Sequence, residues 1–198
     1  MEVTQVVPST VGNRRSEVAS VELSEPSTLR DEGLALPVGE MRLRIGDLES
    51  EAAAKVPRDR GALEITDPVP VTGADLRTRG WANERRSFAL TTHESRLVLA
   101  LDYRRNVSSA LLQSTLRKLE EDNGPSDEFL GGVYTNYRFW DRGRVRLMIV
   151  DTLDSVGGRS MTVALGDSTL MNALRMNLDD ARRDQEQAAR LLDRTMGR

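Results

Sequence analysis

The sequence predicts an α+β fold in which an antiparallel sheet is accompanied by two short helices and a long C-terminal helix. Strand-like runs that alternate apolar and polar residues follow one another across short turns, which is typical of antiparallel strands. Other stretches repeat apolar residues every three or four positions, as amphipathic helices do. The pattern leaves open whether the strands form two sheets or one continuous sheet.

The 198 residues divide into four expected segments, between which charge is unevenly spread. Residues 1–36 hold six acids and three arginines, so the totals of 31 acids and 28 bases leave 25 of each in the rest of the chain. The expected segments are a flexible acidic arm at 1–36, a helix-plus-hairpin module at 37–105, a helix-plus-meander module at 106–167 and a C-terminal helix at 168–198.

A strand, a helix and a hairpin are expected in the first module. Met41–Ile45 alternates apolar and basic side chains, which is typical of a half-buried strand. Asp47 is placed to cap a helix over 48–56, which is rich in Glu and Ala and is ended by a proline. The runs Arg86–Thr92 and Arg96–Tyr103 are separated by a short polar segment and predict a hairpin.

Strict alternation in the second hairpin strand predicts which side chains share a face. A period of two residues places alternate side chains on opposite faces of a sheet. One face should therefore carry Leu97, Leu99 and Leu101, and the other Val98, Ala100 and Asp102.

The second module should begin with a helix and continue as a three-stranded meander. Leu112, Leu116 and Leu119 recur at helical spacing within 107–122. Asn106 or Ser108 can cap its start, and the sequence Asn-Gly-Pro at 123–125 should end it. The expected strands are 133–140, 144–153 and 159–165, with a turn at 141–143 and another at 154–158.

The C-terminal region reads as one long helix over 168–196, capped by Asp167. Its apolar seam repeats alternately every three and four residues, as in a coiled coil. Gln185, Ala188 and Leu192 lie on the distal part of that seam, so we expect them to contact a second copy of the chain or a partner helix. The alternative is that the helix packs across its own sheet.

A family resemblance points in the same direction as the element order. The run Leu36-Pro37-Val38-Gly39, then Ile45–Glu51, a helix, Pro57 and a hairpin, resembles the helix-plus-hairpin modules of BamE-like envelope lipoproteins. Tandem copies of such a unit resemble the β-lactamase-inhibitor-protein fold. The resemblance implies an adaptor that binds other proteins and is not an enzyme, although the chain has neither a lipobox cysteine nor a signal segment.

The chain lacks the residues that most enzyme and metal sites require. It contains no cysteine and one histidine, His93, which lies in the predicted hairpin turn. Its paired glycines do not form a phosphate-binding motif, and its acidic clusters do not have the spacing of a calcium loop. We therefore expect no catalytic residues, no metal and no cofactor, although an enzyme with an unfamiliar carboxylate or arginine site remains a third hypothesis.

One cluster has the character of a binding surface. Arginine outnumbers lysine by 26 to 2, and several arginines alternate with aromatic residues along two predicted strands. Such a surface can hold an acidic partner through charge and stacking. The expected partner-binding residues are Arg138, Trp140, Arg142, Arg144 and Arg146.

These observations favour a non-enzymatic protein-interaction or assembly protein. The alternative is a small-molecule or lipid-binding module with a pocket between helix 107–122 and the sheet. Nucleic acid is disfavoured because the body carries no excess of positive charge. No stretch is long enough to span a membrane, so we expect a cytoplasmic protein, or one of the cell envelope if Met1 replaces a removed signal.

Overall fold

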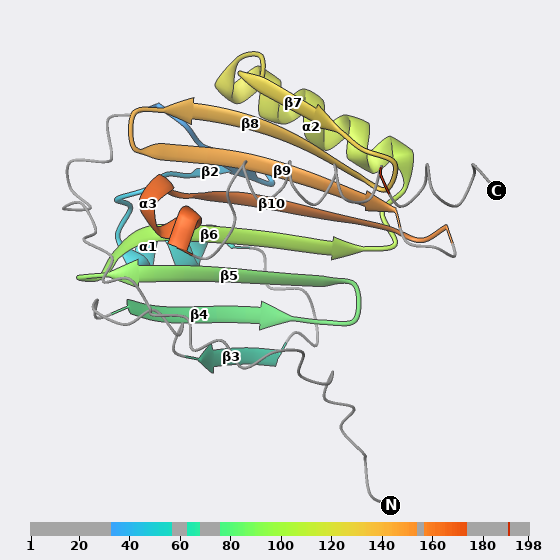
Figure 1. Ribbon diagram of the computed structural model, residues 1–198. Helices are drawn as coiled ribbons and strands as arrows, with labels where there is room; N and C mark the ends of the chain where they lie inside the picture. The colour runs from blue at the N-terminus through green and yellow to red at the C-terminus, as the bar shows by residue number, and fades with distance from the viewer. Residues whose placement is uncertain (1–32, 57–62, 68–75, 154–156, 174–189, 191–198) are drawn as a thin grey trace, which may run out of the picture.

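The computed structural model describes residues 33–56, 63–67, 76–153, 157–173 and 190. Its centre is an eight-stranded antiparallel sheet with the order β3-β4-β5-β6-β10-β9-β8-β7 (Figure 1). The strands are β3 (Leu63–Asp67), β4 (Leu76–Ala82), β5 (Arg86–His93), β6 (Arg96–Arg105), β7 (Glu128–Gly131), β8 (Thr135–Arg142), β9 (Val145–Leu153) and β10 (Arg159–Asp167).

The two halves of this sheet have the same element order and share one sheet. Helix α1 (Glu49–Lys55) precedes β3 to β6, and helix α2 (Ser109–Asn123) precedes β7 to β10. The halves join through their last strands, from Ser160 opposite Arg105 to Gly166 opposite Leu99. The predicted α+β class with an antiparallel sheet is confirmed, and of the two arrangements left open the strands form one continuous sheet. Within the described residues, each half has four strands after its helix, more than the hairpin and the three-stranded meander that were expected. The division at residues 105 and 106 stays a prediction.

The expected long C-terminal helix is not seen in the described part of the chain. Helix α3 covers Ser168–Ala173, and its start is capped as predicted, because Asp167 Oδ1 accepts hydrogen bonds from the backbone N–H groups of Thr169 (2.8 Å) and Leu170 (3.2 Å). The prediction of a long helix is therefore corrected to Ser168–Ala173 in this part of the described chain. Heptad spacing records only which residues could share a helix face, not where packing holds a helix. Gln185, Ala188 and Leu192 lie outside the described residues, and the predicted coiled coil has no support.

Both faces of the sheet are covered. One face carries α1, α2 and the two-stranded hairpin of β1 (Leu36–Val38) and β2 (Met41–Leu43), which lie behind the sheet in Figure 1. The opposite face carries α3. Fully buried side chains fill both layers, including Leu43, Leu119, Trp140, Leu147 and Leu165 on the first face and Leu170 and Met171 on the second.

A β-bulge changes the face pattern predicted for β6. Thr91 pairs with Leu99 and Thr92 with Leu97, which leaves Val98 as an extra residue. Leu97 consequently packs into the core beneath α1 and α2, whereas Val98 and Leu99 pack on the α3 face. The predicted alternation is therefore wrong at this point, because an inserted residue reverses the faces of those that follow it.

Both predicted ends of α2 agree with the structure, whereas the predicted N-terminal cap of α1 does not. Ser108 Oγ accepts the backbone N–H of Leu111 at the start of α2, and Gly124 ends it with φ of 80°. Asp47 does not cap α1. Its Oδ2 instead accepts hydrogen bonds from the Arg44 backbone N–H (3.0 Å) and from Lys55 Nζ (2.7 Å).

Helix α2 is tied to the β1–β2 hairpin by side chains at its C-terminal end. The Asn123 amide donates to the Ala35 carbonyl and accepts from the Ala35 N–H, at 3.0 and 2.7 Å. Arg42 pairs with Asp122, whose hydrogen bond and charge raise the pKa of the Arg42 guanidinium. Lys118 donates to the Gly39 carbonyl. These contacts fix the helix against the β1–β2 hairpin.

Candidate functional site

Trp140, one of the predicted partner-binding residues, is buried in the core. Its side chain has no exposed area, and its indole Nε1–H donates to the Gly124 carbonyl at 2.8 Å. A buried indole with a satisfied N–H belongs to the core rather than to an accessible surface.

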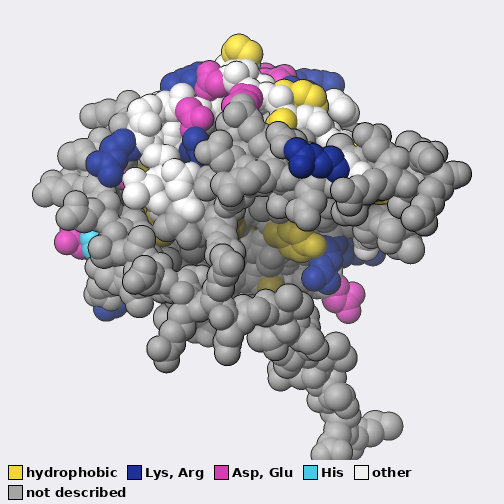
Figure 2. Space-filling view, in the orientation of Figure 1, with side chains coloured by type: hydrophobic (Ala, Val, Ile, Leu, Met, Phe, Trp, Pro, Cys, Tyr) yellow, Lys and Arg dark blue, Asp and Glu magenta, His cyan; other side chains and the backbone are white. Residues whose placement is uncertain are grey.

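The predicted arginines do not gather on one surface. Arg138 lies on the α2 face of the sheet, whereas Arg146 lies on the other face, over the Phe139 ring and paired with Asp141 at 2.7 Å. Arg142 pairs with Asp127 at 2.7 Å, and Arg144 lies in the turn between β8 and β9. In the view of Figure 2, basic and acidic side chains of the described residues are interspersed. Only Arg138 takes part in the site described next.

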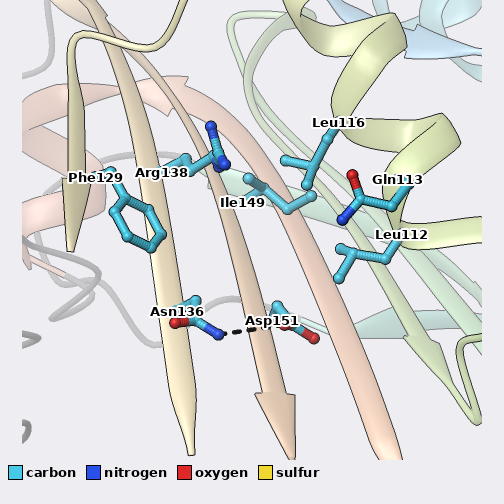
Figure 3. A pocket seen from close by; sticks show the side chains of 8 residues that line it. All are labelled: Leu112, Gln113, Leu116, Phe129, Asn136, Arg138, Ile149 and Asp151. Carbon is cyan, nitrogen blue, oxygen red and sulfur yellow. Dashed lines mark hydrogen bonds between the residues drawn. The ribbon is translucent and has the colours of Figure 1, made fainter. Parts of the chain in front are cut away.

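A pocket of about 200 Å³ lies between α2 and the second half of the sheet (Figure 3). Helix α2 supplies one wall, β7 supplies part of the rim, and β8 and β9 supply the floor. The lining residues are Leu112, Gln113, Leu116, Phe129, Asn136, Arg138, Ile149 and Asp151.

The strand register sets the order of the groups on the pocket floor. Asn136 lies opposite Asp151, and Arg138 lies opposite Ile149. The two pairs are two residues apart along each strand, which corresponds to about 7 Å. Asp151 and Arg138 therefore occupy opposite ends of the pocket, with apolar side chains between them, as Figure 3 shows.

Asp151 is buried with most of its hydrogen-bonding capacity unfilled. The residue is 8% exposed, and its Oδ2 receives one long hydrogen bond from the Asn136 amide, at 3.4 Å. Its Oδ1 lies 3.1 Å from Arg159 Nε, but neither atom has a hydrogen-bond partner among the described residues. A carboxylate can accept about four hydrogen bonds, so this side chain retains capacity for a donor.

The pocket rim consists of a stacked aromatic–arginine pair. The Arg138 guanidinium lies 5.1 Å from the centre of the Phe129 ring and pairs with Glu120 of α2 at 3.3 Å. Phe129 is 57% exposed. Gly131 makes room for the ring, because a Cβ at that position would lie 3.1 Å from two ring carbons. The rim thus presents an apolar ring that a bound molecule could cover.

The arrangement is suited to holding a small molecule. The lining residues combine apolar walls with a few polar groups at defined positions, which is typical of binding pockets. The described residues contain no group of three or more His, Asp or Glu side chains that could hold a metal ion. They also include no helix that is long and apolar enough to cross a membrane.

Part of this site could have been found from the sequence. Asp151 follows Val145, Leu147 and Ile149 at a period of two, so alternation places its carboxylate on a core-facing side of β9. A charged residue on a core face is a functional signal that our sequence interpretation did not use. Phe129 and Asn136 carried no comparable signal.

Comparisons with known proteins add no family to this description. No protein-family model, curated protein or solved structure matches the chain.

Proposed function

We propose that the protein is a non-enzymatic binding module that holds a small molecule in the pocket between α2 and the sheet. The observation that carries the proposal is a formed pocket whose walls are apolar and whose floor contains the incompletely hydrogen-bonded carboxylate of Asp151. A buried polar group whose hydrogen bonds are incomplete is costly, so its presence in a pocket wall favours a ligand that supplies a further donor.

The pocket volume limits the size of the ligand. At about 200 Å³ it is smaller than the pockets of roughly 300–1,000 Å³ that take drug-sized molecules. An apolar cavity of about 150 Å³ is enough for benzene. The pocket therefore suits a single ring with a short substituent, and it is too small for a long lipid chain.

The side chains in the pocket support binding rather than turnover. The lining residues include one carboxylate but neither a histidine nor a hydroxyl group that it could activate. General-base and nucleophilic catalysis require such groups within hydrogen-bonding distance of each other.

A fragment screen of the intact chain by ligand-detected NMR tests the proposal. Single-ring fragments should bind the unmodified protein, and Leu116→Trp, which places an indole in the pocket, should reduce their binding at least tenfold. Leu111→Trp is the matched control, because Leu111 is exposed on the same helix and does not line the pocket. Absence of binding to the unmodified protein, or equal binding to Leu116→Trp, would contradict the proposal.

The protein-interaction hypothesis stays a prediction. Its proposed contact residues are divided between the two sheet faces, the core and the undescribed C-terminal segment, so no single described surface favours it.

A further inference from the structure

We infer that the pocket takes a monocyclic amine, with its protonated amino group at Asp151 and its ring against the apolar wall. This inference rests on the proposed function and adds the chemical class of the ligand. It follows from the contacts of Asp151 and from a second buried aspartate in the same sheet.

The second aspartate is Asp102 on β6, which lies on the α1 and α2 face of the sheet. It shows how arginine side chains can supply all the hydrogen bonds that a buried carboxylate on this face needs. Asp102 Oδ1 and Oδ2 accept hydrogen bonds from Arg86 Nε and Nη2, at 2.8 and 2.9 Å. Oδ2 also accepts from Arg104 Nη2, at 2.7 Å. Each buried carboxylate oxygen therefore has a strong donor, and the carboxylate bridges two cations.

Asp151 lies on the same face and, among the residues that the structure describes, pairs with one cationic side chain instead of two. Asp102 is paired with Val163 of β10, and Asp151 is paired with Met161, so the two carboxylates flank the same strand. That cation is Arg159, whose Nε lies 3.1 Å from Asp151 Oδ1. Its Nη1 donates to Ser109 Oγ at 2.8 Å, and its Nε approaches the carboxylate without forming a hydrogen bond.

Asp151 lines the pocket. Its Oδ1 has no accessible surface, so a second donor would approach Oδ2, which accepts one long hydrogen bond. An alkylammonium group supplies three N–H donors and a positive charge. A carboxylate ligand would instead place a second negative charge beside Asp151. The ligand group that best completes this site is therefore a protonated amine.

The rest of the pocket determines the body of the ligand. Leu112, Leu116 and Ile149 form the apolar wall next to Asp151, and Phe129 stands at the rim. A ring carrying a two-carbon amine would fill this space and cover part of the exposed Phe129 ring. Arg138 is already engaged by Glu120 and Phe129, so it does not require an anionic group from the ligand.

Three probes with the same ring and linker separate this inference from the general binding proposal. 2-Phenylethylamine, 2-phenylethanol and 3-phenylpropionate share a ring and a two-carbon linker but differ in charge and hydrogen bonding. At pH 7 the amine is protonated, as lysine is with its pKa of about 10.4. Isothermal titration of the full chain should show the amine binding about tenfold more tightly than the alcohol, and the acid binding most weakly.

The variant Asp151→Asn should lower amine affinity about tenfold, to that of the alcohol, and leave alcohol affinity unchanged. Glu121→Gln is the matched control, because it removes the same charge from an exposed position on α2 outside the pocket. The side-chain amide signal of Asn136 should shift when the amine binds, because that amide contacts Asp151.

The possible failures are distinguishable. If the alcohol or the acid binds the unmodified protein as tightly as the amine does, the ligand class is wrong and the pocket proposal stands. If none of the probes binds but other single-ring fragments do, the ligand class is again wrong. If no fragment binds, both proposals fail. The comparison of the three probes uses the unmodified protein, so it does not depend on whether Asp151→Asn folds.

Discussion

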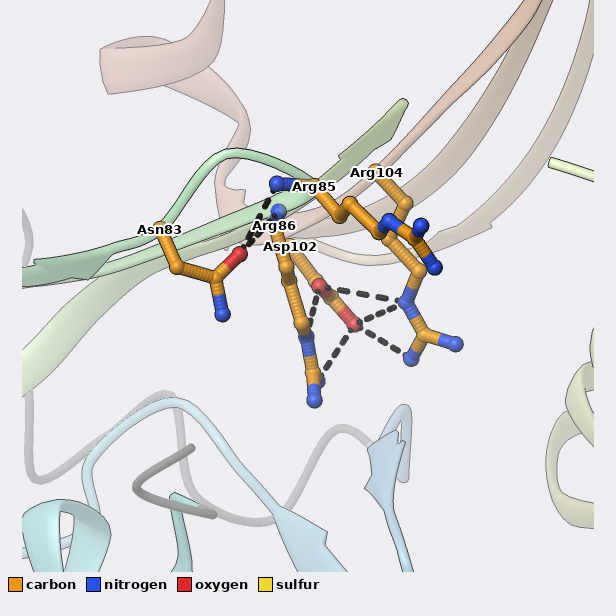
Figure 4. A network of polar contacts seen from close by, with 5 residues as sticks. All are labelled: Asn83, Arg85, Arg86, Asp102 and Arg104. Carbon is orange, nitrogen blue, oxygen red and sulfur yellow. Dashed lines mark hydrogen bonds and ion pairs between the residues drawn. The ribbon is translucent and has the colours of Figure 1, made fainter. Parts of the chain in front are cut away.

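Asp102 and Asp151 are both buried on one face of the same sheet, but their hydrogen bonding differs. Their residues are 2% and 8% exposed, and each has an arginine neighbour. Asp102 lies between the guanidinium groups of Arg86 and Arg104 and is enclosed by them (Figure 4). Asp151 lines a pocket and has one long hydrogen bond.

The difference separates a stabilising role from a binding role. A carboxylate whose oxygens are hydrogen-bonded within the protein gains nothing from a ligand, and its removal leaves its partners buried without a counter-charge. A carboxylate with unfilled capacity contributes less to folding and can gain new partners on binding. Asp102 and Asp151 are the same residue type and are similarly buried. The number and length of their hydrogen bonds distinguish them.

The largest effect is expected from Asp102→Ala. This change leaves Arg86 and Arg104 side by side on neighbouring strands without their shared carboxylate. Breaking a buried ion network by removing one partner costs about 3–5 kcal/mol of unfolding free energy. Urea denaturation followed by circular dichroism measures it, and a loss below about 1 kcal/mol would show that Asp102 is not structurally different from Asp151.

A smaller loss is expected from Asn123→Ala, which releases the end of α2 from the β1–β2 hairpin. The buried N–H and carbonyl of Ala35 lose their amide partner. We expect a loss of about 1–2 kcal/mol and faster hydrogen exchange at the Ala35 amide. Glu121→Ala on the same helix is the control. Unchanged exchange at Ala35 would mean that the Asn123 amide does not hold this end of the helix to the hairpin.

Asp151→Asn should change stability by less than about 1 kcal/mol, because the carboxylate makes one long hydrogen bond and one ion contact without hydrogen-bond geometry. The same urea titration gives this value. A loss as large as that of Asp102→Ala would show that Asp151 is a structural group, and the contrast between the two aspartates would disappear.

The smallest effect is expected from Arg142→Ala. Arg142 pairs with Asp127 at 2.7 Å, but both side chains are about two-fifths exposed. Exposed ion pairs contribute between about 0 and 1 kcal/mol, so we expect a change below about 0.5 kcal/mol that decreases further in high salt. A larger loss, insensitive to salt, would show that exposure does not separate this aspartate–arginine pair from the Asp102 network.

Helix ends and turns, which depend on residues adjacent in sequence, were predictable. Ser108 and Gly124 mark the ends of α2, Asp167 caps α3, and Gly143 takes a positive φ of 54° in the turn between β8 and β9. Each depends on the conformational preference of one or two residues, which remains the same in any fold. The prediction of a pocket beneath helix 107–122 named the region in which the cavity lies, but not the residues of β7 and β9 that line it.

Local preferences thus specify where this chain turns and which segments extend or coil, and they place Asp102 and Asp151 among apolar neighbours. They do not specify which strands meet, because backbone hydrogen bonds are chemically alike in every pair. The pairing of β6 with β10 and the contact of Asn123 with Ala35 join residues that are distant in sequence. Those contacts follow from burying both sheet faces at once, and they leave Asp102 enclosed and Asp151 open to a pocket.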